Sequence, residues 1–134
     1  MLPFHVELVP GTPVYEQLVA AVTRAIVSGE LADGDVFPSV RVLSQHLRIN
    51  PNTAQKAVAH LTAMGLLQVH PGIGTRVARP RPASRAASVH ELRPPAADLV
   101  LEARRRGLSL ADLQALLDAE WQRLDPSPRG ARRG

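Results

Sequence analysis

Four polar side chains of the sequence have the types and spacing needed to recognise nucleic-acid bases. They fall in the first two turns of a helix predicted to begin at Pro51, and they are Asn52, Thr53, Gln55 and Lys56. Asn and Gln can form paired hydrogen bonds with adenine, Thr can bond a base edge or touch a thymine methyl group, and Lys suits guanine or phosphate. Many exposed helix starts are polar, so for each residue taken singly a merely solvated surface is the alternative. As a group they predict a helix that enters the major groove of double-stranded DNA.

The distribution of charge points to the same class of partner. The formal net charge is only +4, but the stretch from Val36 to His90 contains no Asp or Glu. Its basic residues are Arg41, Arg48, Lys56, Arg76, Arg79, Arg81 and Arg85. An acid-free basic stretch of this length is typical of a surface that binds a polyanion, whereas an ordinary solvated surface usually has acids interspersed.

Capping residues divide the first half of the chain into three helices. Thr12 as N-cap and Pro13 in the first turn predict the start of the first helix, which ends at Gly29. Ser39 is the predicted N-cap of the second helix and Asn50 that of the third. The apolar residues of the third helix recur at helical spacing and predict its core face. They are Ala54, Ala57, Val58 and Leu61.

A β-hairpin is predicted after the third helix, with strands at residues 66–70 and 75–78. Gly72 and Gly74 would allow a tight tip and bring backbone N–H groups near a phosphate, although glycines in any hairpin allow the turn alone. Thr75 and Arg76 follow the tip, and the Arg76 guanidinium is a candidate phosphate contact. The order helix, helix, turn, helix, hairpin predicts a winged helix-turn-helix in a mainly helical chain.

The remaining segments are assigned by composition. Residues 1–11 are predicted to be an N-terminal arm before the winged helix-turn-helix of residues 12–79. Residues 80–95 are rich in proline and arginine and predict a basic linker. Two helices are expected within residues 96–125, and a disordered basic tail within residues 126–134.

The last predicted helix carries an apolar stripe that the segment cannot cover by itself. Gly107 and Ser109 separate the two C-terminal helices, and Asp112 completes a capping box with Ser109. Two helices this short cannot bury the whole stripe between them, so a partner surface is implied. The sequence therefore predicts a homodimer held by these helices. The dimerisation residues expected are Leu110, Leu113, Leu117 and Trp121.

Short segments spread over residues 12–79 follow a recognisable order. They are Pro13-Val-Tyr-Glu-Gln-Leu, Ser28-Gly-Glu-Leu, Gly34-Asp, Pro38-Ser-Val-Arg-Val-Leu, Asn50-Pro-Asn-Thr, Ala63-Met-Gly-Leu-Leu and Gly72-Ile-Gly-Thr. With these segments, residues 12–79 resemble the DNA-binding domain of the GntR family of bacterial regulators. The resemblance implies that Ser39 and Arg41 meet the DNA backbone or nearby bases, that the third helix reads bases from Asn50 onward, and that the hairpin tip approaches a groove. A surface ion pair with Asp33 or Asp35 is the alternative for Arg41.

The Asn-Pro-Asn-Thr segment and the short C-terminal region resemble the YtrA-type subfamily, whose members often control transporter operons. This resemblance implies a transcription regulator, expected to be a repressor, that binds a palindromic operator as a homodimer. Many members of the family have an arginine where Pro51 stands, and that arginine commonly reads guanine. Its role does not carry over to this chain. A winged helix that contacts RNA or protein is the alternative function.

Other classes of function find little support. The chain has no cysteine, which excludes disulfides, cysteine zinc sites and thiol nucleophiles. His46, His60 and His70 have no recognised ligand spacing, so no metal site, cofactor or catalytic residue is predicted and the chain is not expected to be an enzyme. No secretory signal or membrane span is found. A cytoplasmic, nucleoid-associated protein is expected, with no effector indicated by the sequence.

Overall fold

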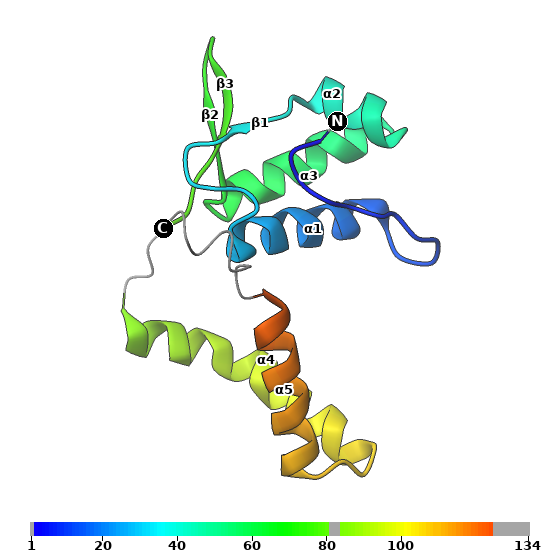
Figure 1. Ribbon diagram of the computed structural model, residues 1–134, viewed down its shortest axis with the longest axis vertical. Helices are drawn as coiled ribbons and strands as arrows, with labels where there is room; N and C mark the ends of the chain where they lie inside the picture. The colour runs from blue at the N-terminus through cyan, green and yellow to red at the C-terminus, as the bar shows by residue number, and fades with distance from the viewer. Residues whose placement is uncertain (1, 81–83, 125–134) are drawn as a thin grey trace. The chain divides into compact units, whose positions relative to one another are not determined.

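The computed structural model describes residues 2–80 and 84–124, which belong to two compact units (Figure 1). The first unit includes residues up to Pro80 and holds three helices and a small sheet. The second, Arg81–Asp125, holds two helices. The helices are α1 (Val14–Ser28), α2 (Val40–Leu47), α3 (Pro51–Ala63), α4 (Arg85–Arg105) and α5 (Leu110–Leu124). The strands are β1 (Val36–Phe37), β2 (Leu67–His70) and β3 (Gly74–Val77).

This architecture confirms the predicted winged helix-turn-helix followed by two C-terminal helices. The strands form one antiparallel sheet in the order β1-β3-β2, in which Leu67 pairs with Val77 and Val36 pairs with Arg76. The β2–β3 hairpin is the wing and projects from the helical body (Figure 1). No helix within the described residues is long and apolar enough to cross a membrane.

The core of the first unit is formed where α1, α2 and α3 meet the base of the wing. Leu18, Val22 and Ile26 of α1 pack with Leu43 of α2 and with the buried face of α3. That face consists of the four residues predicted from helical spacing. They are Ala54, Ala57, Val58 and Leu61.

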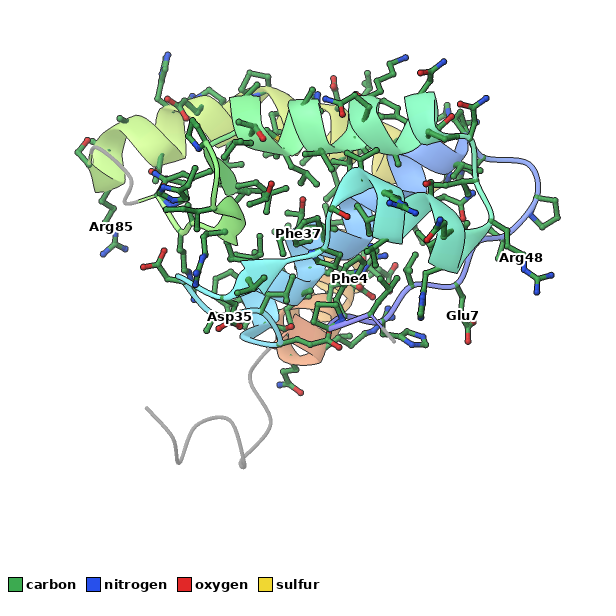
Figure 2. The ribbon with its side chains drawn as sticks, turned by 90° about the horizontal axis from the view of Figure 1, so that it is seen from above. Phe4, Glu7, Asp35, Phe37, Arg48 and Arg85 are labelled. Atoms are coloured by element: carbon green, nitrogen blue, oxygen red, sulfur yellow. The ribbon has the colours of Figure 1, made fainter. Side chains whose placement is uncertain are left out.

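The N-terminal segment is part of this core, a feature that the sequence analysis missed. Phe4 is buried and stacks on Phe37 of β1, with ring centroids 5.6 Å apart and planes 9° from parallel (Figure 2). The Gln17 side chain of α1 donates to and accepts from the backbone of Val9, at 2.8 Å in each case. It also donates to the Thr12 carbonyl at 2.7 Å. The prediction that Thr12 is the N-cap of α1 is wrong. Pro13 holds that position, without a side-chain hydrogen bond.

The predicted linker at residues 80–95 is wrong over most of its length. Helix α4 begins at Arg85, and the Ser84 hydroxyl oxygen caps it by accepting from the Ala87 N–H at 3.0 Å. Pro94 and Pro95 lie inside the helix. A proline removes one backbone donor and clashes with the carbonyl four residues earlier, but the helix continues on both sides of this pair. Residues 81–83 and the predicted tail at 126–134 lie outside the described residues.

Candidate nucleic-acid interface

The start of α2 presents Arg41 from a capped first turn. The Ser39 hydroxyl oxygen accepts a hydrogen bond from the Val42 N–H at 3.1 Å, which confirms the predicted cap. Asp33 and Asp35, the alternative partners of Arg41, instead accept hydrogen bonds from the backbone N–H groups of Arg79 and Ala32. Among the described residues no carboxylate lies within 4.0 Å of the Arg41 side chain. Arg41 is exposed, so its guanidinium is available to a phosphate.

The turn between α2 and α3 fixes where the third helix begins. Arg48 adopts the left-handed conformation with φ +55°, which is uncommon outside glycine. The Ile49 N–H then returns to the Ser44 carbonyl at 3.0 Å. Asn50 is the N-cap of α3, because its side-chain oxygen accepts from the Asn52 N–H at 2.7 Å. The capping bond engages one lone pair of that oxygen, and the amide NH₂ group of Asn50 remains a candidate donor for the predicted DNA contact.

Helix α3 separates its core face from a narrow exposed face. With 3.6 residues per turn, Asn52, Lys56, Ala59 and Ala63 lie opposite the buried residues, and Gln55 lies on one flank. Asn52, Gln55 and Lys56 are exposed, whereas Thr53 is half-buried. The two alanines keep the centre of the face slim enough to approach base edges.

Lys56 has a contact that the sequence analysis did not predict. Its ammonium nitrogen lies 4.7 Å from the ring centroid of Tyr15, in the first turn of α1. Tyr15 belongs to a segment that carried the family resemblance, but spacing along the chain gave no signal that it meets α3. The base-reading prediction for Lys56 therefore concerns a side chain that already has a partner within the domain.

The wing offers an open tip and a constrained root. Gly72 and Gly74 have φ values of +77° and +127°, where other residues would be strained, and both face open space. Thr75 is half-buried beside them. Arg76 donates from its guanidinium to the Gly34 carbonyl at 3.2 Å, so this side chain is held toward the root of the wing. The predicted phosphate contact by Arg76 would have to form from that position.

The second unit differs from the first in the state of its apolar residues. Leu113 is buried within its own chain, so of the four predicted dimerisation residues it is already covered. Leu110 is 68% exposed, Leu117 50% and Trp121 75%. The Ser109–Asp112 capping box is confirmed by hydrogen bonds of 2.9 and 3.1 Å between the two residues. The bonds from Ser109 lower the pKa of the Asp112 carboxyl group.

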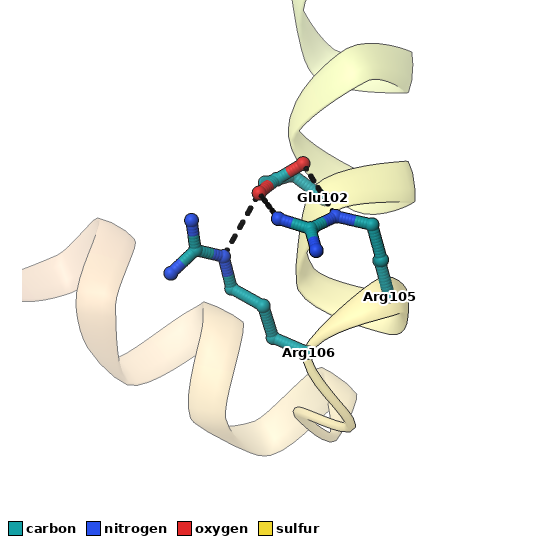
Figure 3. Close-up of polar contacts among 3 residues, drawn as sticks. All are labelled: Glu102, Arg105 and Arg106. Atoms are coloured by element: carbon teal, nitrogen blue, oxygen red, sulfur yellow. Dashed lines mark hydrogen bonds and ion pairs between the residues drawn. The ribbon is translucent and has the colours of Figure 1, made fainter.

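Glu102, Arg105 and Arg106 form a cluster of ion pairs at the C-terminal end of α4 (Figure 3). The Glu102 carboxylate accepts hydrogen bonds from Arg105 and from Arg106, the latter at 2.9 Å. The bond from Arg105, and to a smaller extent that from Arg106, lowers the pKa of Glu102. The bond to Glu102 in turn raises the pKa of Arg105. Within the described ranges, no group of three or more His, Cys, Asp or Glu side chains could hold a metal ion.

Comparison with known proteins agrees with this geometry. The family model described as bacterial regulatory proteins, gntR family, matches residues 14–77. The chain is 36% identical over 67 residues to the HTH-type transcriptional repressor YtrA of Bacillus subtilis, which covers 50% of this chain and 52% of YtrA. It thus spans about half the length of that relative. A second relative, the HTH-type transcriptional regulator Rv1152 of Mycobacterium tuberculosis, is 29% identical over 115 residues, or 84% of this chain and 89% of its own.

A solved structure has a similar fold over nearly the whole chain. It is a crystal structure from Listeria monocytogenes EGD-e, described as a transcriptional antiterminator, with a TM-score of 0.81 and 25% sequence identity. The likeness covers 92% of this chain and 93% of that chain. The winged helix-turn-helix with two further helices is therefore shared with that protein.

Proposed function

Because residues 14–77 belong to the GntR family of bacterial regulatory proteins, we propose that the chain is a transcriptional repressor that binds a palindromic operator as a homodimer. The family is one of DNA-binding regulators and not of enzymes. A position on the nucleoid in the cytoplasm is part of this proposal. No metal or cofactor takes part in the proposed function.

The observation that carries the proposal is the exposed face of α3. Asn52 and Gln55 reach outward from a helix whose start is fixed by the Asn50 cap and by Pro51. Ala59 and Ala63 keep the exposed face narrow toward the end of the helix. The acid-free stretch from Val36 to His90 includes β1, α2, α3 and the wing. Amide side chains on a slim helix surrounded by basic residues suit a major groove.

The exposed stripe of α5 supports the proposed homodimer. Leu110, Leu117 and Trp121 leave an apolar surface that a second copy could cover. A two-fold assembly would present two α3 helices to successive turns of the DNA, which is why a palindromic operator is expected.

Binding to three nucleic acids at one salt concentration tests the proposal. The first is a palindromic duplex recovered from a random-sequence pool by selection with the protein itself, and the others are its scrambled duplex and a single-stranded RNA of the same sequence. We expect the selected duplex to bind about a thousandfold or more tightly than the scrambled one. Equal affinity for the two duplexes would contradict the proposal.

Contact of RNA by the winged helix is the second candidate function. It is supported by the similar fold of the Listeria protein that is described as a transcriptional antiterminator. Preference for the single-stranded RNA over both duplexes in the same assay would support this candidate against the repressor.

Arg41 provides an electrostatic test of the proposed DNA complex. Each neutralised phosphate contributes about −0.9 to the slope of log affinity against log salt. Arg41→Ala should reduce the size of that slope by about one per subunit and weaken the selected and scrambled duplexes alike. Arg24→Ala is the matched control, because Arg24 is an exposed arginine of α1 outside the acid-free stretch. An unchanged slope for Arg41→Ala would place Arg41 away from the DNA backbone.

Control of a transporter operon is the most specific part of the proposal. It is supported by similarity to YtrA, which is described as a transcriptional repressor, and by the subfamily resemblance. Deletion of the gene should raise transcription of a neighbouring transporter operon, and a copy carrying Asn52→Ala should fail to restore repression. Lower transcription after deletion would indicate an activator instead.

A further inference from the structure

Lys56 is the only lysine in the sequence, and every other basic side chain that is not histidine is an arginine. This single ammonium group lies on α3, the helix proposed to enter the major groove. An ammonium is a compact point charge that suits a phosphate oxygen, whereas the planar guanidinium suits paired hydrogen bonds. A lysine at this position therefore suits a contact to phosphate.

The ring of Tyr15, on α1, contacts the side chains of both Lys56 and His60, on α3. Its nitrogen lies over the Tyr15 ring at 4.7 Å, within the range of a cation–π interaction. His60, one turn further along α3, meets the same ring edge-on, with centroids 5.7 Å apart and planes at 85°. Tyr15 is half-buried and packs against the core. The ring is therefore fixed from two sides and gives the ammonium a rigid platform.

The contact with Tyr15 directs the Lys56 ammonium toward one edge of the exposed face of α3. His60 lies on the flank that meets α1 through Tyr15, and Gln55 lies on the opposite flank. Lys56 lies between them, beside Asn52. A lysine that reads bases would extend straight outward from the face. The contact with Tyr15 instead holds the ammonium at the junction of α1 and α3, where the flanking backbone of a groove-bound duplex would pass.

The charge of Lys56 is not neutralised within the domain. In the ranges that the structure describes, no carboxylate lies within 4.0 Å of its nitrogen. An aromatic ring attracts a cation but accepts none of the three conventional N–H hydrogen bonds that the ammonium can donate. Lys56 is also exposed. The group is thus ordered, charged and open to an anionic oxygen.

We propose that Tyr15 is a positioning residue that orders Lys56 as a contact to a DNA phosphate, so that this lysine contributes to affinity and not to base recognition. The inference rests on the proposed DNA-binding function. A free lysine loses much of its rotamer freedom when it binds, and ordering the side chain beforehand reduces that cost. This role for Lys56 replaces the expectation that it reads a base edge.

A double-mutant cycle on the selected and scrambled duplexes tests the inference. We expect Tyr15→Leu to weaken both duplexes about two- to fivefold, the size of an exposed cation–π contact. In a Lys56→Met background the same change should have no further effect. Tyr15→Phe keeps the ring face and should bind as the unaltered protein does. Lys56→Met should also reduce the size of the salt slope by about one per subunit.

Three outcomes would overturn the inference. The first is that Tyr15→Leu weakens binding equally with and without Lys56, since Tyr15 would then act only on the fold. The second is that Lys56→Met affects the selected duplex alone, which would make Lys56 a base-reading residue. The third is an unchanged salt slope. Failure of the unaltered protein to distinguish the two duplexes would contradict the proposed function itself and is recognised separately.

A measurement without DNA covers the case in which Tyr15→Leu does not fold. Reductive methylation with ¹³C-formaldehyde labels only the α-amine and Lys56, and the methylated lysine keeps its charge. The methyl signal of Lys56 should lie upfield of its position in the urea-unfolded chain, because the group sits over the Tyr15 ring. It should stay there in Tyr15→Phe. Identical shifts in the folded and unfolded chains would show that the contact does not form in solution and would overturn the inference.

Discussion

The two units of the chain differ in how far their apolar side chains are buried. In the first unit, Val22, Leu43 and Leu61 have no exposed surface. In the second, Ala103 and Leu113 are the buried residues within the part that the structure describes, while Trp121 remains 75% exposed. Both units contain helices with an apolar stripe, so helical spacing alone does not distinguish them. The first unit thus completes its core within one chain, whereas the second leaves apolar side chains of α5 exposed, which is the basis of the proposed homodimer.

The largest expected effect tests the closed core of the first unit. Leu61→Ala removes a fully buried side chain from α3 and should lower the free energy of unfolding by about 2–5 kcal/mol. Val36→Ala is the control, because Val36 is apolar but 64% exposed and should change stability by no more than about 0.5 kcal/mol. Denaturant unfolding followed by circular dichroism measures both. Similar losses of stability for the two variants would contradict the distinction between a closed core at Leu61 and an exposed surface at Val36.

Trp121 tests the open stripe of the second unit. Trp121→Ala should weaken the proposed homodimer by about 2 kcal/mol or more, as truncation of a buried interface aromatic commonly does. Ile73→Ala is the matched control, since Ile73 is 73% exposed but lies in the wing. Sedimentation equilibrium gives the association constants. Trp121 is the only tryptophan, so its emission should also shift to the blue as the protein concentration rises. A monomer at micromolar concentration would contradict the prediction.

Base reading by α3 sharpens the role assigned to the first unit. Asn52→Ala or Gln55→Ala should cost about 1–3 kcal/mol on the selected duplex and leave weak binding to the scrambled duplex nearly intact. Gln122→Ala supplies an amide control on α5, outside the proposed nucleic-acid interface. Titrations of both duplexes at one salt concentration decide the matter. Equal losses on the two duplexes would mean that these amides touch only the backbone.

The smallest expected effect concerns the ion pairs at the end of α4. The pKa of Glu102 is lowered in the folded chain by Arg105 and then Arg106, so its stabilising contribution is present above its ordinary pKa. It is lost as the pH falls through the lowered value. Glu102→Gln should therefore reduce the difference in thermal stability between neutral and acidic solution, slightly, because the pair is exposed and screened by salt. Glu91→Gln on the same helix is the control. An equal acid response in Glu102→Gln and the unaltered protein would argue against the pairing.

Local signals in the sequence were sufficient for most helix ends. Ser39 and Asn50 cap α2 and α3 as predicted, Gly29 adopts the left-handed conformation after α1, and Ser109 forms its capping box. Each of these depends on hydrogen bonds or dihedral angles within a few residues. The start of α4 was not found, because Pro94 and Pro95 obscured a helix that has its own cap upstream.

Features that depend on distant residues could not be predicted. Strand β1 has two residues and no periodicity to detect, and Phe4 meets Phe37 only once the sheet exists. The DNA-contact residues were chosen by type and helix face, and that choice remains a prediction. What the sequence could not supply is the partner of each side chain, such as Tyr15 for Lys56 or Gly34 for Arg76. Those partners decide which candidates are free to bind.

The proline pair inside α4 has a consequence for the exchange of backbone amides with solvent. Neither Pro94 nor Pro95 has an N–H, so the carbonyls of His90 and Glu91 lack the donor that normally lies four residues further along a helix. The hydrogen-bond ladder is interrupted there, and residues before the pair are mostly exposed. Because helix formation is cooperative, the turns on either side can open independently. Deuterium uptake should be fast before Pro94 and slower toward Ala103, which is buried.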